Sequence, residues 1–263
     1  MTQSRGLSVR RAIAFLCVSL AALASTPARA IDKALLDKLA AHAAKVDKAL
    51  RDGSFTVLVV SDELDSDGKP KKHSESKRQV STTKEGDRHA EVLSASEDGK
   101  DTTAEERKKQ AEREAKRKAS KEAPKSNVSL PFEPEQAGKL FFWTVGTDAK
   151  TGLVRLGFWP KGARSDEVLE GEAVIDPVRG ETVSVRMKPS KMPTFVDRMD
   201  LELGFDAVTD GVRLLSTLKV AGEGGIAFVK RRGSAVTTFS DYALPAAASA
   251  APAGSSAAPA GGR

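Results

Sequence analysis

The stretch EGEAVIDPVRGETVSVRMK (170–188) carries the clearest fold signal in the chain. In its second half Val183, Val185 and Met187 alternate with polar residues, so one face of the segment is apolar and the other is polar. A period of two is typical of a β-strand with one buried face. The joint DPVRG (176–180) contains the aspartate, proline and glycine that favour a turn. The stretch therefore predicts an antiparallel hairpin with one solvated face.

The same pattern continues on both sides of this hairpin. Short joints rich in glycine and aspartate separate the segments, among them TDAKTG (147–152), TDG (209–211) and GEGG (222–225). Joints of that kind connect neighbouring strands of an antiparallel meander. A sheet with an apolar face has to curl, close or be covered. The predicted strands, about ten, lie at 54–64, 77–84, 89–96, 139–146, 153–160, 168–176, 181–188, 199–208, 212–222 and 226–242.

The segment 31–53 is the best cover for the apolar face. Leu39 and Val46 belong to a set of apolar residues at helical spacing, and Gly53 can end the helix. We expect a mainly β (α+β) fold, in which a strongly curved antiparallel sheet stays unclosed as a half-barrel and this helix lies in its concave face. His42 lies in the helix, and we expect an ordinary, partly exposed side chain rather than a metal ligand.

A second helix, of another character, interrupts the strands. RKKQAEREAKRKASK (107–121) holds eight basic and two acidic residues, and the predicted insertion spans 101–123. Alanines spaced by four form a narrow stripe, which suits loose contact with another surface. Three interpretations remain open: a solvated helix, a lid over the concave face, or a basic finger toward anionic lipid or a partner. Its candidate contact residues are Lys116, Arg117 and Lys118.

The chain ends predict export. Residues 1–30 combine Arg5, Arg10 and Arg11 with the apolar run 12–23 and the small residues before Ala30, as a signal peptide does. The alternative, a membrane anchor, requires roughly 20 apolar residues, and this run is shorter. Removing the segment leaves a nearly neutral chain, and no aromatic platform accompanies the basic helix, so we expect no nucleic-acid partner. The predicted domain spans 31–242, and the Ala/Pro/Ser/Gly-rich tail 243–263 is predicted to be a disordered spacer.

Residues with catalytic chemistry are few. Glu170, Glu172 and Asp176 share one strand face and could resemble catalytic carboxylates, but pairing with Arg186 and Lys188 across the hairpin explains them as well. The acidic run 61–68 lacks the bidentate glutamate of a calcium loop, so we expect a hairpin turn there. Only three histidines occur. We therefore predict no catalytic site, no metal site and no cofactor.

The loop 187–199 mixes basic and apolar residues, including Lys191, Arg198 and Phe195. That mixture suits the rim of a site that touches a membrane surface or a protein partner. Ordinary packing of Phe195 under the sheet edge is the alternative.

Three segments resemble a known family: 170–188, FDAVTDGVRLLSTLKV (205–220) and the closing TTFSDY (237–242). They are similar to the C-terminal strands of bacterial outer-membrane lipoprotein-sorting proteins, which share a half-barrel with the periplasmic lipoprotein carrier (LolA/LolB-like). The resemblance implies an unclosed sheet with helices over its hollow, acyl chains or a hydrophobic peptide held inside, and no catalysis or cofactor. The charged helix departs from it, because a helix that plugs a hollow should be more apolar.

Two functional hypotheses result. The first is an exported periplasmic or cell-envelope protein that binds an acyl chain, lipid or lipoprotein in an apolar hollow, lined by Trp143, Phe158, Met187, Leu203 and Phe205. The second is an envelope interaction or sensor module that docks a protein partner through the basic helix and the 187–199 loop, including Lys191. Peripheral contact with a membrane is compatible with either.

Overall fold

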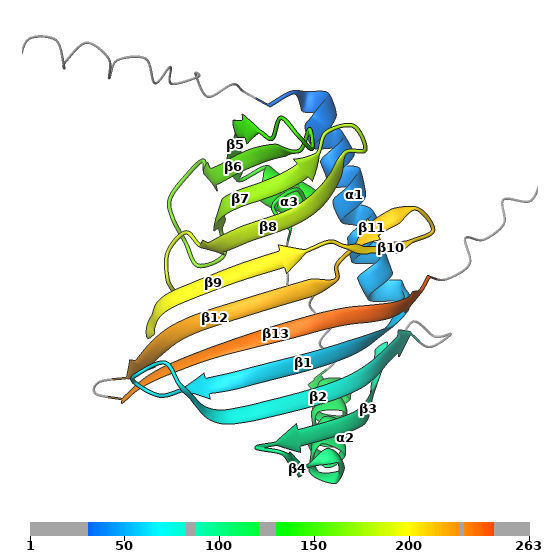
Figure 1. The fold of residues 1–263 in the computed structure, drawn as a ribbon, viewed down its shortest axis with the longest axis vertical. Coiled ribbons are helices and arrows are strands. Elements are labelled where there is room, and N and C mark those ends of the chain that lie inside the picture. The colour runs from blue at the N-terminus through cyan, green and yellow to red at the C-terminus, as the bar shows by residue number, and fades with distance from the viewer. Residues whose placement is uncertain (1–30, 83–87, 121–129, 227–228, 245–263) are drawn as a thin grey trace, which may run out of the picture.

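The computed structural model describes residues 31–82, 88–120, 130–226 and 229–244; the side chains of 117–120, 226 and 229 are not described. The predicted signal peptide and most of the predicted tail lie outside these residues. Eleven of the strands form one unclosed antiparallel sheet, in the order β4-β3-β2-β1-β13-β12-β9-β8-β7-β6-β5 (Figure 1). The predicted mainly β fold with a large unclosed sheet is confirmed.

The elements follow the sequence periodicity closely. The helices are α1 (Lys33–Asp52), α2 (Thr103–Ser120) and α3 (Pro134–Ala137). The strands are β1 (Ser54–Leu64), β2 (Pro70–Thr82), β3 (Arg88–Glu97), β4 (Lys100–Asp101), β5 (Leu140–Thr147), β6 (Val154–Pro160), β7 (Leu169–Asp176), β8 (Glu181–Pro189), β9 (Val196–Gly204), β10 (Ala207–Thr209), β11 (Val212–Leu214), β12 (Thr217–Ile226) and β13 (Val229–Ala243).

The chain builds the sheet from two directions. β1 to β4 run outward from the middle of the sheet to one edge, and β5 to β9 return from the opposite edge. Strands β12 and β13 then fill the gap, and β13 pairs with β1 over most of its length. A small β10–β11 hairpin leaves the sheet between β9 and β12 and lies beside α1 (Figure 1).

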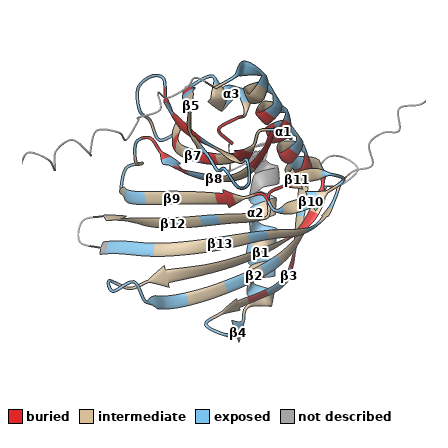
Figure 2. Cartoon of the chain, turned by 45° about the horizontal axis from the view of Figure 1, so that its top comes forward, coloured by how far each residue is buried: buried red, intermediate tan, exposed pale blue. Residues whose placement is uncertain are grey.

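α1 crosses one face of the sheet, which we call the helix face. The Asp32 carboxylate accepts a hydrogen bond from the Ala34 amide at 3.1 Å and caps the helix, and Gly53 ends it by donating to the Ala49 carbonyl at 3.0 Å. Its buried residues meet Leu156, Ala173, Val185 and Leu203 of the sheet, together with Leu214 and Leu215 after β10 (Figure 2). The core therefore sits between α1 and strands β6 to β9.

Several predicted boundaries were wrong, among them the start of β2, which lies at Pro70 rather than at residue 77. GEGG (222–225) is not a turn, because these residues continue β12 up to Ile226. A Cβ atom on Gly224 would lie 2.3 Å from the Phe195 carbonyl oxygen, so the glycine allows β12 to approach the segment just before β9 closely. The predicted strands 199–208 and 212–222 are each interrupted, since Phe205 and Leu215 leave the sheet to enter the core around the β10–β11 hairpin.

Candidate functional site

The predicted hollow residues divide between the two faces of the sheet. Phe158, Met187, Leu203 and Phe205 belong to the buried core under α1. Trp143 pairs with Gly157, the neighbour of Phe158, and therefore points to the opposite face. We call that opposite side the open face. The structure thus brings four of the five residues together and leaves Trp143 apart from them.

Little space remains beneath α1. Leu39 and Ala43 of the helix are fully buried, as are Leu203 and Phe205 of the sheet side. The cavity beside Val46 in this layer measures about 10 Å³, about the size of a single water. In the described chain, the layer under α1 is therefore packed and offers no volume for an acyl chain.

His42 fastens α1 to the rest of the molecule. Its Nδ1 lies 3.3 Å from the Thr182 amide of β8, and its Nε2 lies 2.7 Å from the Arg213 carbonyl oxygen of β11. An amide can only donate, so Nδ1 accepts and Nε2 carries the proton. Burial lowers the pKa of His42, against the raising influence of the Arg213 carbonyl and the Glu181 carboxylate. The expected partly exposed side chain is therefore wrong: the residue is a buried, neutral link.

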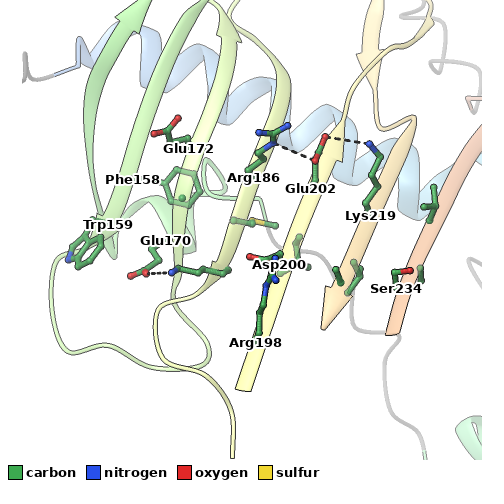
Figure 3. Close-up of a pocket in the computed structure, with 18 of the residues that line it drawn as sticks. Phe158, Trp159, Glu170, Glu172, Arg186, Arg198, Asp200, Glu202, Lys219 and Ser234 are labelled. Atoms are coloured by element: carbon green, nitrogen blue, oxygen red, sulfur yellow. Dashed lines mark hydrogen bonds and ion pairs between the residues drawn. The ribbon is translucent and has the colours of Figure 1, made fainter. Parts of the chain in front are cut away.

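A groove of about 850 Å³ lies on the open face. It runs across the strands between two rows of side chains, as Figure 3 shows. The first row contains Trp143, Glu172, Arg186, Glu202, Lys219 and Val236; the second contains Trp159, Glu170, Lys188, Asp200, Ala221 and Ser234. The floor is the intervening rung of backbone, from Phe158 to Ala235. We call this feature the open-face groove.

Charges alternate along both rows. In the first, Glu202 lies between Arg186 at 3.4 Å and Lys219 at 3.6 Å (Figure 3). In the second, Glu170 pairs with Lys188 at 3.5 Å, which confirms that predicted cross-strand pairing. Arg186 instead turns from Glu172 to Glu202. These ion pairs are partly exposed and contribute little to stability, but they line the groove with both signs of charge.

One end of the groove is aromatic. Trp143 lies over Gly157, and the Arg164 guanidinium lies 4.3 Å from the ring centroid of Trp159. Behind them the Glu170 side chain is nearly buried; its Oε2 accepts no hydrogen bond in the described chain and lies 3.6 Å from Arg164. This end therefore combines the flat apolar surface of the two indole rings with the ion pair of Arg164 and Glu170.

The segment 187–199 borders the same groove, but only residues 190–195 form a loop, because 187–189 belong to β8 and 196–199 to β9. Lys188 and Arg198 line the groove, while Lys191 is exposed and its amide donates to the Ser165 carbonyl. Phe195 is 62% exposed and has a positive φ of 69°, which is rare for a bulky residue. Packing of Phe195 beneath the sheet edge is therefore excluded, and contact with a membrane or partner stays a prediction.

The basic helix α2 lies elsewhere. It packs on β3, whereas the 187–199 loop joins β8 to β9, six and five positions further along the sheet. It also lies behind the sheet in the view of Figure 1, on the side of α1. Lys116 is exposed, and the side chains of Arg117 and Lys118 lie outside the described residues. The helix and the loop therefore do not form one docking surface.

Asp176, the third acidic residue of the predicted strand face, has a structural role. Asp176 accepts hydrogen bonds from the amides of Val178 and Arg179 in the turn after β7. In the described ranges no three histidine, cysteine or acidic side chains gather as a metal site would require. No helix in these ranges is both long and apolar enough to cross a membrane.

Sequence reasoning missed Trp159, Glu202 and Lys219. The signal was present, because polar or aromatic residues alternate with core residues in each of these strands. The sequence does not indicate the order of strands β9, β12 and β13, and this order is what places those residues in rows.

Comparisons with known proteins gave distant structural matches, two of which are complexes of MucB. No family model and no curated protein match the sequence. MucB in complex with MucA(peri) matches at 11% identity, covering 76% of this chain and 93% of the matched chain, with a TM-score of 0.23. A MucA/MucB complex of Pseudomonas aeruginosa matches at 12% identity, covering 78% and 94%, with a TM-score of 0.24. Both TM-scores are low, so neither match indicates the function of this chain.

Proposed function

We propose that this chain is a non-catalytic binding protein of the cell envelope that holds an extended segment of a protein partner in the open-face groove. The groove, about 850 Å³ with both signs of charge and an aromatic end, is the observation that carries the proposal. Its envelope location rests on the predicted signal peptide in residues 1–30.

The dimensions of the groove fit a polypeptide. It crosses from β5 to β13, which is six steps between neighbouring strands. At a spacing of about 4.8 Å per step, its length is roughly 29 Å, enough for about nine extended residues. A peptide of mixed sequence can place apolar side chains on Trp143 and Trp159 and exchange hydrogen bonds with the charged rows.

An acyl chain fits less well. In the open-face groove it would cover Glu202, Arg186 and Lys219 without replacing their contacts with water, which costs free energy. On the helix face it would have to displace α1, whose residues Leu39 and Ala43 are fully buried. Lipid binding therefore remains the alternative hypothesis and requires an opening of the core.

Site-specific photocrosslinking in the producing cell tests the proposal. A benzophenone amino acid at Ala221, an exposed residue of the second row, should give a discrete adduct with a protein. The same group at Val178, an 84% exposed turn residue away from the groove, should give none. Mass spectrometry of the adduct separates a protein partner from a lipid.

A charge reversal inside the groove tests the same proposal, and a charge reversal outside the groove is its matched control. Glu202→Lys removes both ion pairs of the first row and should abolish the Ala221 adduct. Glu91→Lys reverses an exposed charge on β3, outside the groove, and should leave the adduct intact. A lipid adduct, or equal adducts from Ala221 and Val178, would contradict a protein-binding groove.

A further inference from the structure

The two edges of the large sheet differ. One edge ends in β4, which has only two residues, and α2 packs beside it on β3. The other edge is β5, eight residues long, with the sequence LFFWTVGT. β5 contains no charged residue and no proline. Sheet edges are commonly blunted by short strands, charges, proline, β-bulges or a covering helix. β5 has none of the first three; its register shifts only between Thr144 and Gly146, and the short helix α3 contacts it.

The backbone of β5 has a defined outward side. The Lys161 amide donates to the Lys139 carbonyl at 2.8 Å, so these two residues form a hydrogen-bonded pair of the β5–β6 ladder. Hydrogen-bonded pairs recur at every second residue of an antiparallel ladder. Phe141 and Trp143 therefore bond to β6, whereas the amides and carbonyls of Phe142 and Thr144 point away from it. Among the described residues, no strand pairs with that side.

The side chains around this edge select the chemistry of a partner strand. On the open face, β5, β6 and their ends carry Lys139, Arg155 and Lys161, and neither strand contains an acidic residue. Lys161 also lies 5.8 Å from the Phe141 ring centroid. On the helix face, Phe142 stacks on Phe132 with their ring centroids 5.5 Å apart. One face of an added strand thus meets cations, and the other meets aromatic carbon.

We propose that β5 is the docking edge for an extended segment of a protein partner, in which acidic residues facing Lys139, Arg155 and Lys161 alternate with apolar residues beside Phe142. Another polypeptide backbone can pair with the outward main-chain groups of β5, and the cations set the charge that suits it. A second copy of this chain would bring like charges together. The inference rests on the proposed function only in that the partner is a polypeptide, and Trp143 places the edge beside the open-face groove.

A synthetic peptide tests the edge directly. The probe is a fluorescent peptide of about nine residues in which glutamate and valine alternate, enough to cover the eight residues of β5. The purified protein should bind it more tightly than the matching lysine/valine peptide. N-methylation of alternate peptide amides, which removes main-chain donors, should weaken binding about tenfold.

Two variants at one position isolate the main chain. Thr144→Pro removes an outward amide, and proline is tolerated on strand edges that face solvent. It should weaken binding of the glutamate/valine peptide about tenfold, whereas Thr144→Val, which keeps the amide, should not. If Thr144→Pro fails to fold, the N-methylated peptide decides. Lys139→Glu together with Lys161→Glu should reverse the preference between the two peptides.

Several outcomes would overturn the inference. Equal binding of the N-methylated and unmodified peptides would rule out main-chain pairing, as would equal binding by Thr144→Pro and Thr144→Val. Self-association with slow hydrogen exchange at the Phe142 and Thr144 amides would assign the edge to a second copy. Peptide binding that is lost in Glu202→Lys and kept in Thr144→Pro would support the groove and reject the edge. The converse would support the edge, and the groove would then be judged by the Ala221 crosslinking experiment alone.

Discussion

At the scale of single residues, His42 shows how a polar side chain can hold a helix on a sheet. Both of its ring nitrogens have partners on other elements, the Thr182 amide and the Arg213 carbonyl. Its position in α1 could be read from the sequence, and its burial could not, because Thr182 and Arg213 lie more than a hundred residues away. A buried histidine in this arrangement is stable only when neutral.

The pH dependence of unfolding should reveal that His42 is neutral in the folded protein. The folded-state pKa of His42 is lowered from 6.5 by burial, so the unfolded chain takes up the proton first. The contribution of His42 is present above about pH 6.5 and is lost as pH falls through and below that value. Urea unfolding at a series of pH values measures the slope.

A substitution separates His42 from the other histidines. The pKa of His73 is raised by hydrogen bonds to Asp62 and then Glu75, so its contribution runs the opposite way and is lost as pH rises. His42→Gln should cost about 1–3 kcal/mol at neutral pH, as for an unmade buried hydrogen bond. The substitution should also reduce the loss of unfolding free energy below about pH 6.5. If the pH dependence of that free energy is unchanged, His42 does not cause the loss.

Gly157 makes room for the aromatic end of the groove. A Cβ atom there would lie 2.3 Å from Cζ2 of Trp143, so Gly157→Ala should push the indole away from the strand. The chain has two tryptophans, and a Trp159→Phe background leaves Trp143 as the only one. Its fluorescence should shift to longer wavelength as the ring becomes wetter.

The control for this experiment is Gly162→Ala in the same background. Gly162 has no heavy atom within 4 Å of the position of a Cβ, so the fluorescence should stay unchanged. An equal shift in both variants would mean that Trp143 does not rest on Gly157.

At the scale of elements, α2 contacts the sheet by its polar side. Ala104, Ala111 and Ala115 are exposed, so the expected contact through the alanine stripe was wrong. Arg107 donates to the Val92 carbonyl at 3.0 Å, and Glu106 lies 3.6 Å from Arg78. The sheet there presents the Arg78 guanidinium and the Val92 carbonyl, which match a polar helix side better than alanine methyls.

Two substitutions on α2 should therefore differ in effect. Arg107→Ala removes the bond to β3, and we expect about 1 kcal/mol of lost stability and faster hydrogen exchange along α2. Ala111→Gln changes an exposed stripe residue and should change neither. Hydrogen exchange of the α2 amides is the measurement. Protection lost in Ala111→Gln and kept in Arg107→Ala would restore the stripe as the contact face.

Strand positions could be predicted where alternation was unbroken, as in β7 and β8. Prediction failed where a residue leaves the ladder for the core. Phe205 fits the alternating pattern of Leu201 and Leu203, and only its packing in the core shows that β9 stops short of it. Leu215 follows Leu214 directly and likewise lies in the core, before β12 begins. Local periodicity describes which face a residue takes, whereas the end of a strand can depend on distant contacts.

At the scale of the whole molecule, the curved unclosed sheet and its covering helix were predictable, because ten one-sided strands leave few alternatives. The order of the strands was not. The sequence of β1 does not indicate that its second neighbour, on the side opposite β2, is the last strand, β13. The open-face groove depends on that order, so the site could be predicted only as separate residues. Four of the five predicted hollow residues lie in one apolar layer, but α1 packs against that layer and fills it.

The pairing of β1 with β13 also sets the order in which the protein can be assembled. The strands that leave the ribosome first, β1 to β4, form a ladder whose inner edge waits for the strand made last. Until β13 arrives, the chain is two incomplete sheets, each with an open inner edge, and many contacts span most of the sequence. Such long loops are slow to close. The complete eleven-stranded sheet can therefore form only when synthesis of the chain is nearly finished.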